Sequence, residues 1–372
     1  MLLCAKYILI MKHNIERYFQ QIWYEGRKPP RLLKPLEKLY QRVVNRKRYR
    51  FLRDAGASYS PKAPVVIVGN ITVGGTGKTP LTLFLIERFK EKGLRVGVVS
   101  RGYGGAAKQY PIAVDKACNA EHVGDEPLMV HLRSGAPVVV DPNRVAAAKY
   151  LEQHYDVDII ISDDGLQHYA LNRSVEIVVM DATRGIGNGR CLPSGPLREP
   201  VTRLASVDFL IVNSGDINDL SSGVRTEFSD VDASFSMQIE AEGLEPVFRP
   251  KGNKPLPCPS RNTEVYGVAG IGNPARFFST LSAFGYLVTE RPFPDHHQYK
   301  QGDFELMSNK PIIMTEKDAV KVHSLESTSS LINSWYLKVS ANISPFLIDG
   351  ILQKLYPEKY SSGKYRPGTH RS

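Results

Sequence analysis

Cysteine is scarce in this 372-residue chain, and long uncharged segments are missing. The four cysteines (Cys4, Cys118, Cys191 and Cys258) lie far apart and form no Cys-x-x-Cys pair. This excludes a disulfide framework and a zinc knuckle and favours a reducing compartment. The longest stretch without Asp, Glu, Lys or Arg is residues 63–77, fifteen residues long. Since a membrane-spanning helix needs about 20 apolar residues, no ordinary transmembrane helix is predicted.

Acidic residues are scarce at the start of the chain. Residues 1–62 hold fifteen Lys and Arg but only four Asp and Glu, a net charge of +11, whereas the whole chain carries +10. The other 310 residues therefore sum to −1. A basic arm on a nearly neutral body argues against a protein that binds nucleic acid across its main surface. Length and the 42% apolar content favour two packed domains and exclude a disordered chain.

The basic arm has apolar residues at helical spacing. They recur at steps of three and four as Ile15, Tyr18, Phe19, Ile22 and Trp23, and again after Pro29 and Pro30 as Leu32, Leu33, Leu36, Leu39, Tyr40 and Val43. Two interpretations stay open: a helix lying in a membrane interface with its cations toward anionic lipid, or a helix packed on the protein's own body. Contact of residues 46–50 with RNA is a minor alternative. Residues 1–10 are too short and too interrupted by Lys6 for a secretory signal, and Met11 is an alternative start.

A glycine-rich loop joins a predicted strand, residues 64–70, to a predicted helix, residues 81–92. Its glycines let backbone N–H groups turn toward phosphate oxygens, and the helix presents its positive end to the same anion. Lys78 is predicted to reach the β and γ phosphates, and the Thr79 hydroxyl to bind Mg²⁺. Thr72 stands where the usual pattern has glycine. The predicted nucleotide-binding residues are Thr72, Val73, Gly74, Gly75, Thr76, Gly77, Lys78 and Thr79.

Short apolar runs follow in alternation with helical segments, at residues 95–100, 137–140, 158–162, 175–180 and 208–212. This order predicts an α/β fold with a doubly wound, mostly parallel sheet, similar to P-loop NTPases. Ligands of such sheets bind at the carboxyl ends of the strands. Asp163 and Asp164 end one strand there, so both are candidate magnesium ligands.

Loops supply further polar candidates. Asp125 opens a helix, and on local evidence it is an ordinary N-cap. Arg144 lies in the first turn of another helix, where a cation opposes the helix dipole and so invites an anionic partner. Arg198 and Glu199 lie in the rigid loop 193–200, which is either a surface loop or a phosphate clamp with a metal-shell carboxylate. Gln167 is a candidate for orienting a nucleophile or a metal-bound water.

The C-terminal part predicts a second, smaller α/β unit. Residues 233–239 and 244–248 alternate like an antiparallel ribbon, and a proline-rich stretch to residue 261 follows. Strands are expected at residues 265–269, 311–314 and 335–339. The expected division is a basic arm (1–62), a P-loop core (63–232), a ribbon-like connection (233–261), the smaller unit (262–356) and a tail (357–372). Adjacent histidines at 296 and 297 point to opposite sides of most backbones, so a metal site there is not favoured.

Together these motifs resemble one family closely, the tetraacyldisaccharide 4'-kinases, which are the lipid A 4'-kinases of Gram-negative bacteria. The resemblance extends over nearly the whole chain and is carried by residues 15–17, 22–24, 69–80, 100–104, 123–127, 163–168, 195–199 and 293–296. It implies transfer of the ATP γ-phosphate, with magnesium, to the 4'-hydroxyl of a tetraacylated glucosamine disaccharide 1-phosphate. The product is lipid IVA, formed at the cytoplasmic face of the inner membrane. No nucleic acid and no obligate protein partner are expected.

The resemblance also implies roles for individual residues. Asp125 becomes the base that accepts the proton of the sugar hydroxyl, paired with His296, and this reverses the local preference for a helix cap. Lys78, Arg144 and Arg198 would neutralise the γ-phosphate. The implied magnesium ligands are Thr79, Asp163, Asp164 and Glu199. The family commonly begins with a more apolar first helix, so the basic arm here predicts a peripheral membrane contact.

Two other functions stay open on the sequence. Asn213 and Asp216 have the spacing that guanine-binding proteins use but lack the lysine between them, which weakly suggests a switch GTPase or a partition-type ATPase. A nucleotide-regulated membrane adaptor would use the basic arm without any sugar kinase activity.

Overall fold

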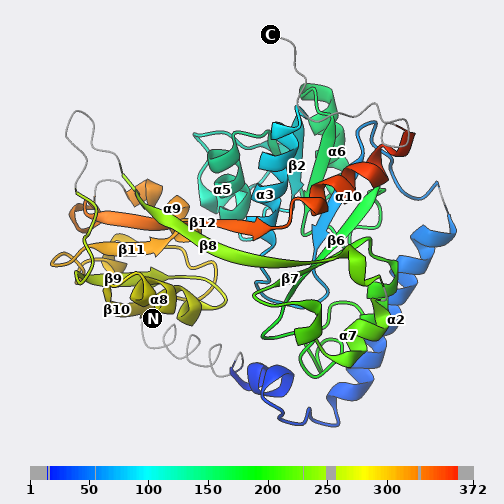
Figure 1. The fold of residues 1–372 in the computed structure, drawn as a ribbon, viewed down its shortest axis with the longest axis horizontal. Helices are drawn as coiled ribbons and strands as arrows, with labels where there is room; N and C mark the ends of the chain where they lie inside the picture. Colours follow the sequence, from blue (N-terminus) through cyan, green and yellow to red (C-terminus); the bar gives the residue numbers. More distant parts are fainter. Residues whose placement is uncertain are drawn as a thin grey trace.

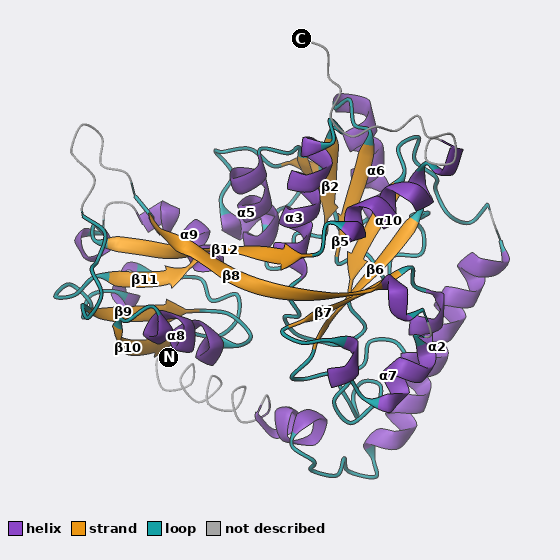
Figure 2. Ribbon diagram, in the orientation of Figure 1, coloured by secondary structure: helices purple, strands orange, loops and turns teal. Residues whose placement is uncertain are grey.

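A single sheet of 12 strands runs through the computed structural model, which describes residues 15–358 apart from residues 16, 55, 229, 249–256, 326 and 327. The strand order is β10-β9-β11-β12-β8-β7-β6-β1-β5-β2-β4-β3. All neighbours are parallel except β12 with β8 and β3 with β4. The predicted mostly parallel α/β fold is therefore confirmed. Figure 2 shows helices along both faces of the sheet.

The central strands are buried along their whole length. They are β1 (Val65–Gly69), β2 (Val96–Ser100), β4 (Val138–Val140), β5 (Ile159–Asp163), β6 (Val175–Asp181) and β7 (Phe209–Asn213), with the short β3 (Ile112–Ala113) at the edge. Every residue of these strands except those of β3 is buried, as expected where helices cover both faces of a parallel sheet. The five apolar runs identified in the sequence all form strands here.

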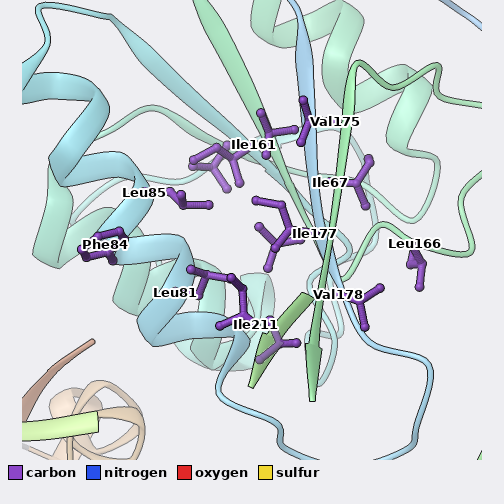
Figure 3. Packing of buried hydrophobic residues seen from close by; sticks show 14 of the residues in the cluster. Ile67, Leu81, Phe84, Leu85, Ile161, Leu166, Val175, Ile177, Val178 and Ile211 are labelled. Atoms are coloured by element: carbon purple, nitrogen blue, oxygen red, sulfur yellow. The ribbon is translucent and has the colours of Figure 1, made fainter. Parts of the chain in front are cut away.

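Helix α3 (Lys78–Glu91) covers one face of this part of the sheet. Leu81, Leu85 and Phe89 follow one another at steps of four and are each 0% exposed. Figure 3 shows Leu81 and Leu85 pointing at strand residues such as Ile161 and Ile177. This packing fixes the start of α3, and with it the end of the glycine-rich loop. The other helices of the core are α4 (Ala120–Val123), α5 (Asp125–Ser134), α6 (Arg144–His154) and α7 (Ser222–Glu227).

Two long strands connect the core to the smaller part of the sheet. The runs 233–239 and 244–248, expected to pair with each other as a ribbon, instead form one continuous strand, β8 (Ser234–Pro246). It pairs in parallel with β7 and antiparallel with β12 (Ser334–Ile343), which comes about 100 residues later. The expectation of a ribbon was wrong because the alternation belongs to a half-exposed strand whose partner is distant in the sequence. Figure 1 shows β8 passing from one part of the molecule to the other.

The smaller part holds the rest of the sheet, with β9 (Glu264–Ala269), β10 (Leu287–Pro292) and β11 (Ile312–Thr315). Its helices are α8 (Pro274–Ala283) and α9 (Glu316–Val322). Helix α10 (Phe346–Leu355) returns to the core, where Leu347 and Ile351 are buried in the same hydrophobic cluster as β1 and β6. The predicted strands at 265–269, 311–314 and 335–339 are confirmed, whereas β10 was not expected.

The basic arm contributes a helical segment at residues 17–24 and the long helix α2 (Leu33–Arg53). One face of α2 contacts the body: Glu37 is buried, and the Tyr40 hydroxyl donates to the carbonyl of Arg198 at 2.9 Å. Beside this contact face, Leu36 is 52% and Leu39 56% exposed. Packing on the body and an open apolar face thus occur in the same helix. No helix among the described residues combines the length and apolarity that crossing a membrane requires.

Candidate active site

The glycine-rich loop lies between β1 and α3, at the carboxyl end of the central strand. Gly74 and Gly77 have φ of 100° and 96°, in the left-handed region that favours glycine. A Cβ on Gly77 would lie 2.8 Å from Nδ2 of Asn213, so the loop also needs glycine there for close packing. A Cβ on Gly75 would meet nothing within 4 Å. The loop therefore has one open side, where its backbone can approach a phosphate.

The loop 193–200 lies against the phosphate loop and explains the unusual Thr72. The Val73 N–H donates to the carbonyl of Pro196 at 2.9 Å, and the Arg198 N–H donates to the carbonyl of Ile71 at 2.7 Å. Thr72, which is buried, forms an isolated antiparallel bridge with Leu197. Thr72 has no positive φ, so the backbone here does not require the usual glycine. The same pairing brings Arg198 to the site.

Three of the predicted site residues meet directly. The Lys78 ammonium lies 3.5 Å from Oδ1 of Asp164, and the Arg198 guanidinium donates to both oxygens of that carboxylate at 3.0 Å. Burial acts to raise the pKa of Asp164, but the charges of Lys78 and Arg198 outweigh it and lower the pKa to about 2. Asp164 is therefore ionised at neutral pH. It holds the two cations ready for an anionic ligand.

Asp163 has a different environment, although it is adjacent. Its side chain is buried, and its Oδ1 has no hydrogen-bond partner. Burial, with the nearby charges of Glu126 and Asp164, raises its pKa to about 7. Arg144, also buried, donates to the carbonyl of Asp163 at 3.0 Å. An unpartnered buried carboxylate oxygen is a position that a hard cation such as Mg²⁺ would fill.

Glu199 is held by donors from its own surroundings. Gln167 donates to Oε1 at 2.9 Å and Tyr169 to Oε2 at 2.5 Å. Gln167 also donates to the carbonyl of Asn70 at 3.2 Å, so the carboxylate anchors a side chain beside the phosphate loop. Both carboxylate oxygens of Glu199 therefore accept a hydrogen bond from a protein side chain. This arrangement favours a positioning role for Glu199.

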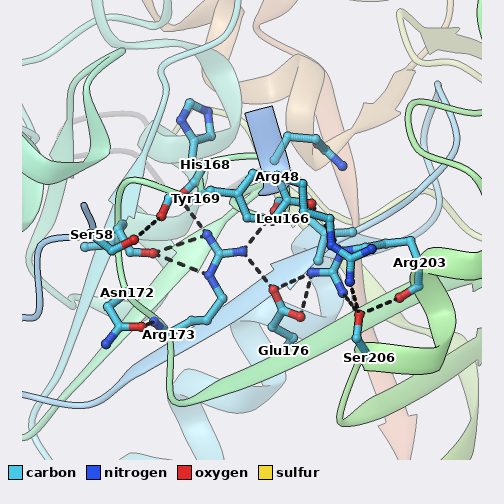
Figure 4. A network of polar contacts seen from close by, with 12 residues as sticks. Arg48, Ser58, Leu166, His168, Tyr169, Asn172, Arg173, Glu176, Arg203 and Ser206 are labelled. Atoms are coloured by element: carbon cyan, nitrogen blue, oxygen red, sulfur yellow. Dashed lines mark hydrogen bonds and ion pairs between the residues drawn. The ribbon is translucent and has the colours of Figure 1, made fainter. Parts of the chain in front are cut away.

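A buried ion network supports the segment that follows Asp164. Figure 4 shows Arg173 and Arg203 converging on the carboxylate of Glu176. Arg173 donates to the carbonyls of Leu166 at 3.0 Å and His168 at 2.7 Å, and to Glu176 at 2.7 Å. Arg203 donates to Glu176 at 2.5 and 2.6 Å. Because these charges are paired at short range, Arg173 is held in place. Its hydrogen bonds to backbone carbonyls in turn hold the segment that follows the two aspartates in one conformation.

Asp125 and His296 form a pair between the two parts of the sheet. His296 Nδ1 lies 3.0 Å from Oδ2 of Asp125, which is 3% exposed. Asp125 is the first residue of α5, after a cap at Gly124, and its Oδ1 accepts the Glu126 N–H at 2.9 Å. Burial acts to raise the pKa of Asp125, but the hydrogen bond from His296 and the charge of Lys317 lower it overall. The carboxylate is ionised, as a general base requires.

Two lysines on α9 also face Asp125, and the sequence analysis missed them. Lys317 Nζ lies 3.9 Å and Lys321 Nζ 4.0 Å from its Oδ2. In the sequence they belong to an ordinary helix start, with Thr315 as the cap and Asp318 three residues later. No local signal could have revealed their contact with a residue nearly 200 positions earlier.

A cavity of about 200 Å³ opens beside this pair, between α5 and α9. Asp125 and His296 line one end of it, and Lys116 and Lys321 bring positive charge to its wall. The turn after β9 lies close by: a Cβ on Gly272 would lie 3.7 Å from the backbone nitrogen of Gly75. The phosphate loop and the smaller part of the sheet therefore face each other across the site.

Asn213 and Asp216, the possible guanine-reading pair, are otherwise engaged. Asn213 Nδ2 donates to the carbonyl of Thr76 at 3.0 Å and so helps to hold the phosphate loop in place. Asp216 accepts the Asn218 N–H at 3.0 Å and caps a short helical turn. Neither side chain is left to recognise a base.

Comparison with known proteins identifies the family. The family model described as tetraacyldisaccharide-1-P 4'-kinase, LpxK, matches residues 30–356. The chain belongs to the tetraacyldisaccharide 4'-kinase family. Among its curated relatives, the tetraacyldisaccharide 4'-kinase of Pseudomonas fluorescens strain SBW25 is 45% identical over 340 residues, 91% of this chain and 96% of the relative. The enzyme of Pseudomonas aeruginosa strain LESB58 is 43% identical over 326 residues, 88% of this chain and 93% of the relative.

A solved structure of the tetraacyldisaccharide 4'-kinase family has the same fold. LpxK from Aquifex aeolicus, described as an "apo" form in complex with ATP, matches with a TM-score of 0.70 at 25% sequence identity. The match covers 87% of this chain and 98% of that one. The family expected from the sequence motifs and the P-loop kinase fold are both confirmed.

Proposed function

We propose that this chain transfers the γ-phosphate of ATP to the 4'-hydroxyl of tetraacyldisaccharide 1-phosphate, forming lipid IVA in lipid A biosynthesis. The observation that carries the proposal is the ionised Asp125, which is held by His296 and lines a cavity, while the turn at Gly272 next to Asp295 faces the phosphate loop. A phosphate loop alone would suit many nucleotide-binding proteins. A buried base facing a separate cavity is what transfer to a hydroxyl acceptor requires.

In the proposed reaction the acceptor sugar enters the cavity and places its 4'-hydroxyl against Asp125. The carboxylate accepts the hydroxyl proton as the oxygen attacks the γ-phosphorus, and the bond to the β-phosphate oxygen breaks to release ADP. His296 holds the carboxylate in its orientation by hydrogen bonding at 3.0 and 3.2 Å. Lys116 and Lys321 in the cavity wall suit an acceptor that carries a phosphate.

Three cations are proposed to balance the charge of the transferred phosphoryl group. Lys78 and Arg198 are held together by Asp164, and Arg144 lies beside Asp163 in the first turn of α6. Phosphoryl transfer depends on position and charge more than on covalent chemistry, so pre-arranged cations supply much of the rate enhancement.

Magnesium fits the residues present. Thr79 at the start of α3, the open Oδ1 of Asp163 and the carboxylate of Asp164 are hard oxygen donors. The described residues hold no group of three or more His, Cys, Asp or Glu that could form a complete metal cage. This suits an ion that keeps waters and takes phosphate oxygens from ATP. When bound, it would neutralise negative charge on the phosphates.

The basic arm is proposed to rest on the cytoplasmic face of the inner membrane. Leu36, Leu39 and Val43 on α2 are between 52% and 59% exposed, although they are apolar. The cations of the arm would lie at the level of anionic headgroups. An acylated acceptor resides in the same membrane, so this contact would bring the site to its substrate.

A transfer assay tests the function. γ-³²P-ATP, Mg²⁺ and the acylated disaccharide 1-phosphate in mixed micelles are incubated with wild-type protein and with Asp125→Asn. The proposal predicts a labelled lipid that co-migrates with lipid IVA, and a strongly reduced yield with the variant. GTP in place of ATP, with hydrolysis measured in the absence of acceptor, covers the switch-GTPase alternative. Slow acceptor-independent hydrolysis of GTP with no labelled lipid would contradict the kinase function.

A further inference from the structure

Lys317 lies at the centre of the polar contacts around the Asp125–His296 pair. Its Nζ is 3.1 Å from Oε1 of Glu126, 3.3 Å from Oδ1 of Asp295 and 3.4 Å from Nε2 of His296. The side chain is 15% exposed. An ammonium group has three donor hydrogens and no acceptor, so these contacts use its whole capacity. Lys317 thus connects α5 of the core to the 295–296 loop of the smaller part.

The contact with His296 determines where the imidazole carries its proton. An ammonium group can only donate, so Nε2 of His296 accepts the hydrogen bond and bears no proton in this arrangement. The proton of the neutral ring then lies on Nδ1, which faces Asp125 at 3.0 Å. His296 therefore donates a hydrogen bond to the carboxylate. In this tautomer Nδ1 has no free lone pair with which to take a proton from Asp125.

The charges around Asp125 depend strongly on this lysine. The acidic groups at this junction are Asp125, Glu126, Asp295 and Asp318, and the cations are Lys317 and Lys321. Lys321 is bound mainly to Asp318, at 2.6 Å, and reaches Asp125 only at 4.0 Å. The ring of Tyr103 packs edge-on against His296 at 4.9 Å between centroids and adds no charge. Without Lys317, four carboxylates would share one ammonium group.

We propose that Lys317 is a positioning residue for the base: it fixes His296 as the Nδ1–H tautomer and keeps Asp125 ionised, so that Asp125 is the final acceptor of the sugar proton. The catalytic part of this inference rests on the proposed kinase function. His296 orients the carboxylate and does not relay the proton. His296 itself has φ of 59°, an uncommon backbone conformation for a residue other than glycine, and Lys317 bonded to the adjacent Asp295 helps to hold it.

Activity against pH separates this role from a merely structural one. Charge on Lys317 lowers the pKa of Asp125, so its loss in Lys317→Met raises that pKa and moves the acid limb of the kcat/KM profile to higher pH. We expect kcat to fall about a hundredfold near neutral pH, the order of a general-base contribution, with KM for ATP unchanged. Lys317→Arg keeps the charge and should retain the wild-type acid limb. Lys310→Met, at a surface pair with Glu264, is the matched control.

Nuclear magnetic resonance of ¹⁵N-histidine-labelled full-length protein gives a readout that does not need turnover. The His296 signal, assigned with His296→Ala, should show Nδ1–H with an unprotonated Nε2 in wild type and in Lys317→Arg, and should show a proton on Nε2 in Lys317→Met, where no ammonium group faces that nitrogen. An Nε2–H tautomer in wild type, or a Lys317→Met variant whose kcat falls with an unmoved acid limb, would overturn the inference. If wild type transfers no phosphate to the disaccharide, the proposed function fails, while the tautomer still decides the role of Lys317.

Discussion

Nδ1 of His296 lies 3.0 Å from Oδ2 of Asp125, although the two residues are 171 positions apart. They come from opposite parts of the sheet, α5 in the core and the loop after β10 in the smaller part. The candidate base is therefore complete only where the two parts meet. The first prediction tests this pair.

Removing the charge of Asp125 should remove the proposed general base without unfolding the protein. Asp125→Asn is nearly isosteric, so we expect kcat to fall by about 10²–10⁴-fold, with little change in ATP affinity because the phosphate loop is untouched. His296→Ala should give a smaller loss, since the carboxylate remains. Transfer rates and ATP titration calorimetry measure the two effects. Transfer at the wild-type rate by Asp125→Asn would remove Asp125 from the mechanism.

Lys78 should matter mainly for the nucleotide. Its ammonium group lies 3.5 Å from Asp164 and is ready to move to a phosphate. Lys78→Met should weaken ATP binding at least about tenfold, the equivalent of one charge-assisted contact, and should also lower kcat. Calorimetry with a non-hydrolysable ATP analogue gives the affinity directly. Lys90→Met, at the far end of α3, has an exposed side chain bonded to a backbone carbonyl and should bind the analogue normally.

The buried carboxyl group of Asp163 should make the stability of the folded, metal-free protein depend on pH. Burial raises its pKa from 3.8 to about 7, so the folded state holds the proton more tightly than the unfolded chain. Its contribution to stability is complete below about pH 4 and is lost as the pH rises through about 7. Between about pH 5.5 and about pH 8 the melting temperature of wild type should therefore fall relative to that of Asp163→Asn.

Asp164→Asn is the control for that experiment. The pKa of Asp164 is lowered to about 2, so its stabilising contribution is present above about pH 4 and changes little over the same interval. Because the charge of Asp164 contributes to the raised pKa of Asp163, the gap in melting temperature between wild type and Asp164→Asn should change somewhat, but less than the gap to Asp163→Asn. Parallel behaviour of both variants would contradict the raised pKa of Asp163.

Gly69 should tolerate no side chain. A Cβ there would lie 2.6 Å from Cβ of Leu166, on the segment that follows the two aspartates. Gly69→Ala should destabilise the fold by about 1–3 kcal/mol through overpacking and should also reduce activity. Gly223→Ala in α7, where a Cβ meets nothing within 4 Å, should be neutral or slightly stabilising. Urea unfolding of the two variants makes the comparison.

The open face of α2 should bind anionic lipid. Replacing Leu36 and Leu39 by serine removes two exposed apolar side chains, and we expect binding to anionic vesicles to weaken at least about tenfold. High salt should weaken wild-type binding by screening the arm's cations. Leu306→Ser removes an 87% exposed leucine from the smaller part and should leave co-sedimentation unchanged. Equal binding by all three proteins would argue against α2 as the membrane contact.

The sequence predicted those parts of the site that lie close together along the chain. The phosphate loop needs glycine, Lys78 and Thr79 within a few residues, and Asp163 ends a strand whose burial follows from its apolar run. Asp125 had no such signal, because a carboxylate at a helix start is usually a cap. Its role came only from the resemblance to a known family. Lys317 was missed altogether, since its importance depends on contacts across the sheet.

The long strand β8 is a second feature that the sequence predicted only in part. Its alternating residues indicated a strand, but the identity of its partners depended on β7 and on β12, which lies about 100 residues later. Pairing over such a distance is set by the whole sheet and not by local pattern. The local pattern therefore predicted a strand here but not its partners.

The continuity of the sheet limits how this protein can be divided. A fragment ending at residue 232 would keep the phosphate loop and Asp125, but it would lose β8, so that β7 would pair only with β6 and its other edge would be open. An apolar strand with unpaired N–H and C=O groups readily joins a strand of another chain. It would also lose α10, whose buried leucines cover the core. We expect such a fragment to aggregate.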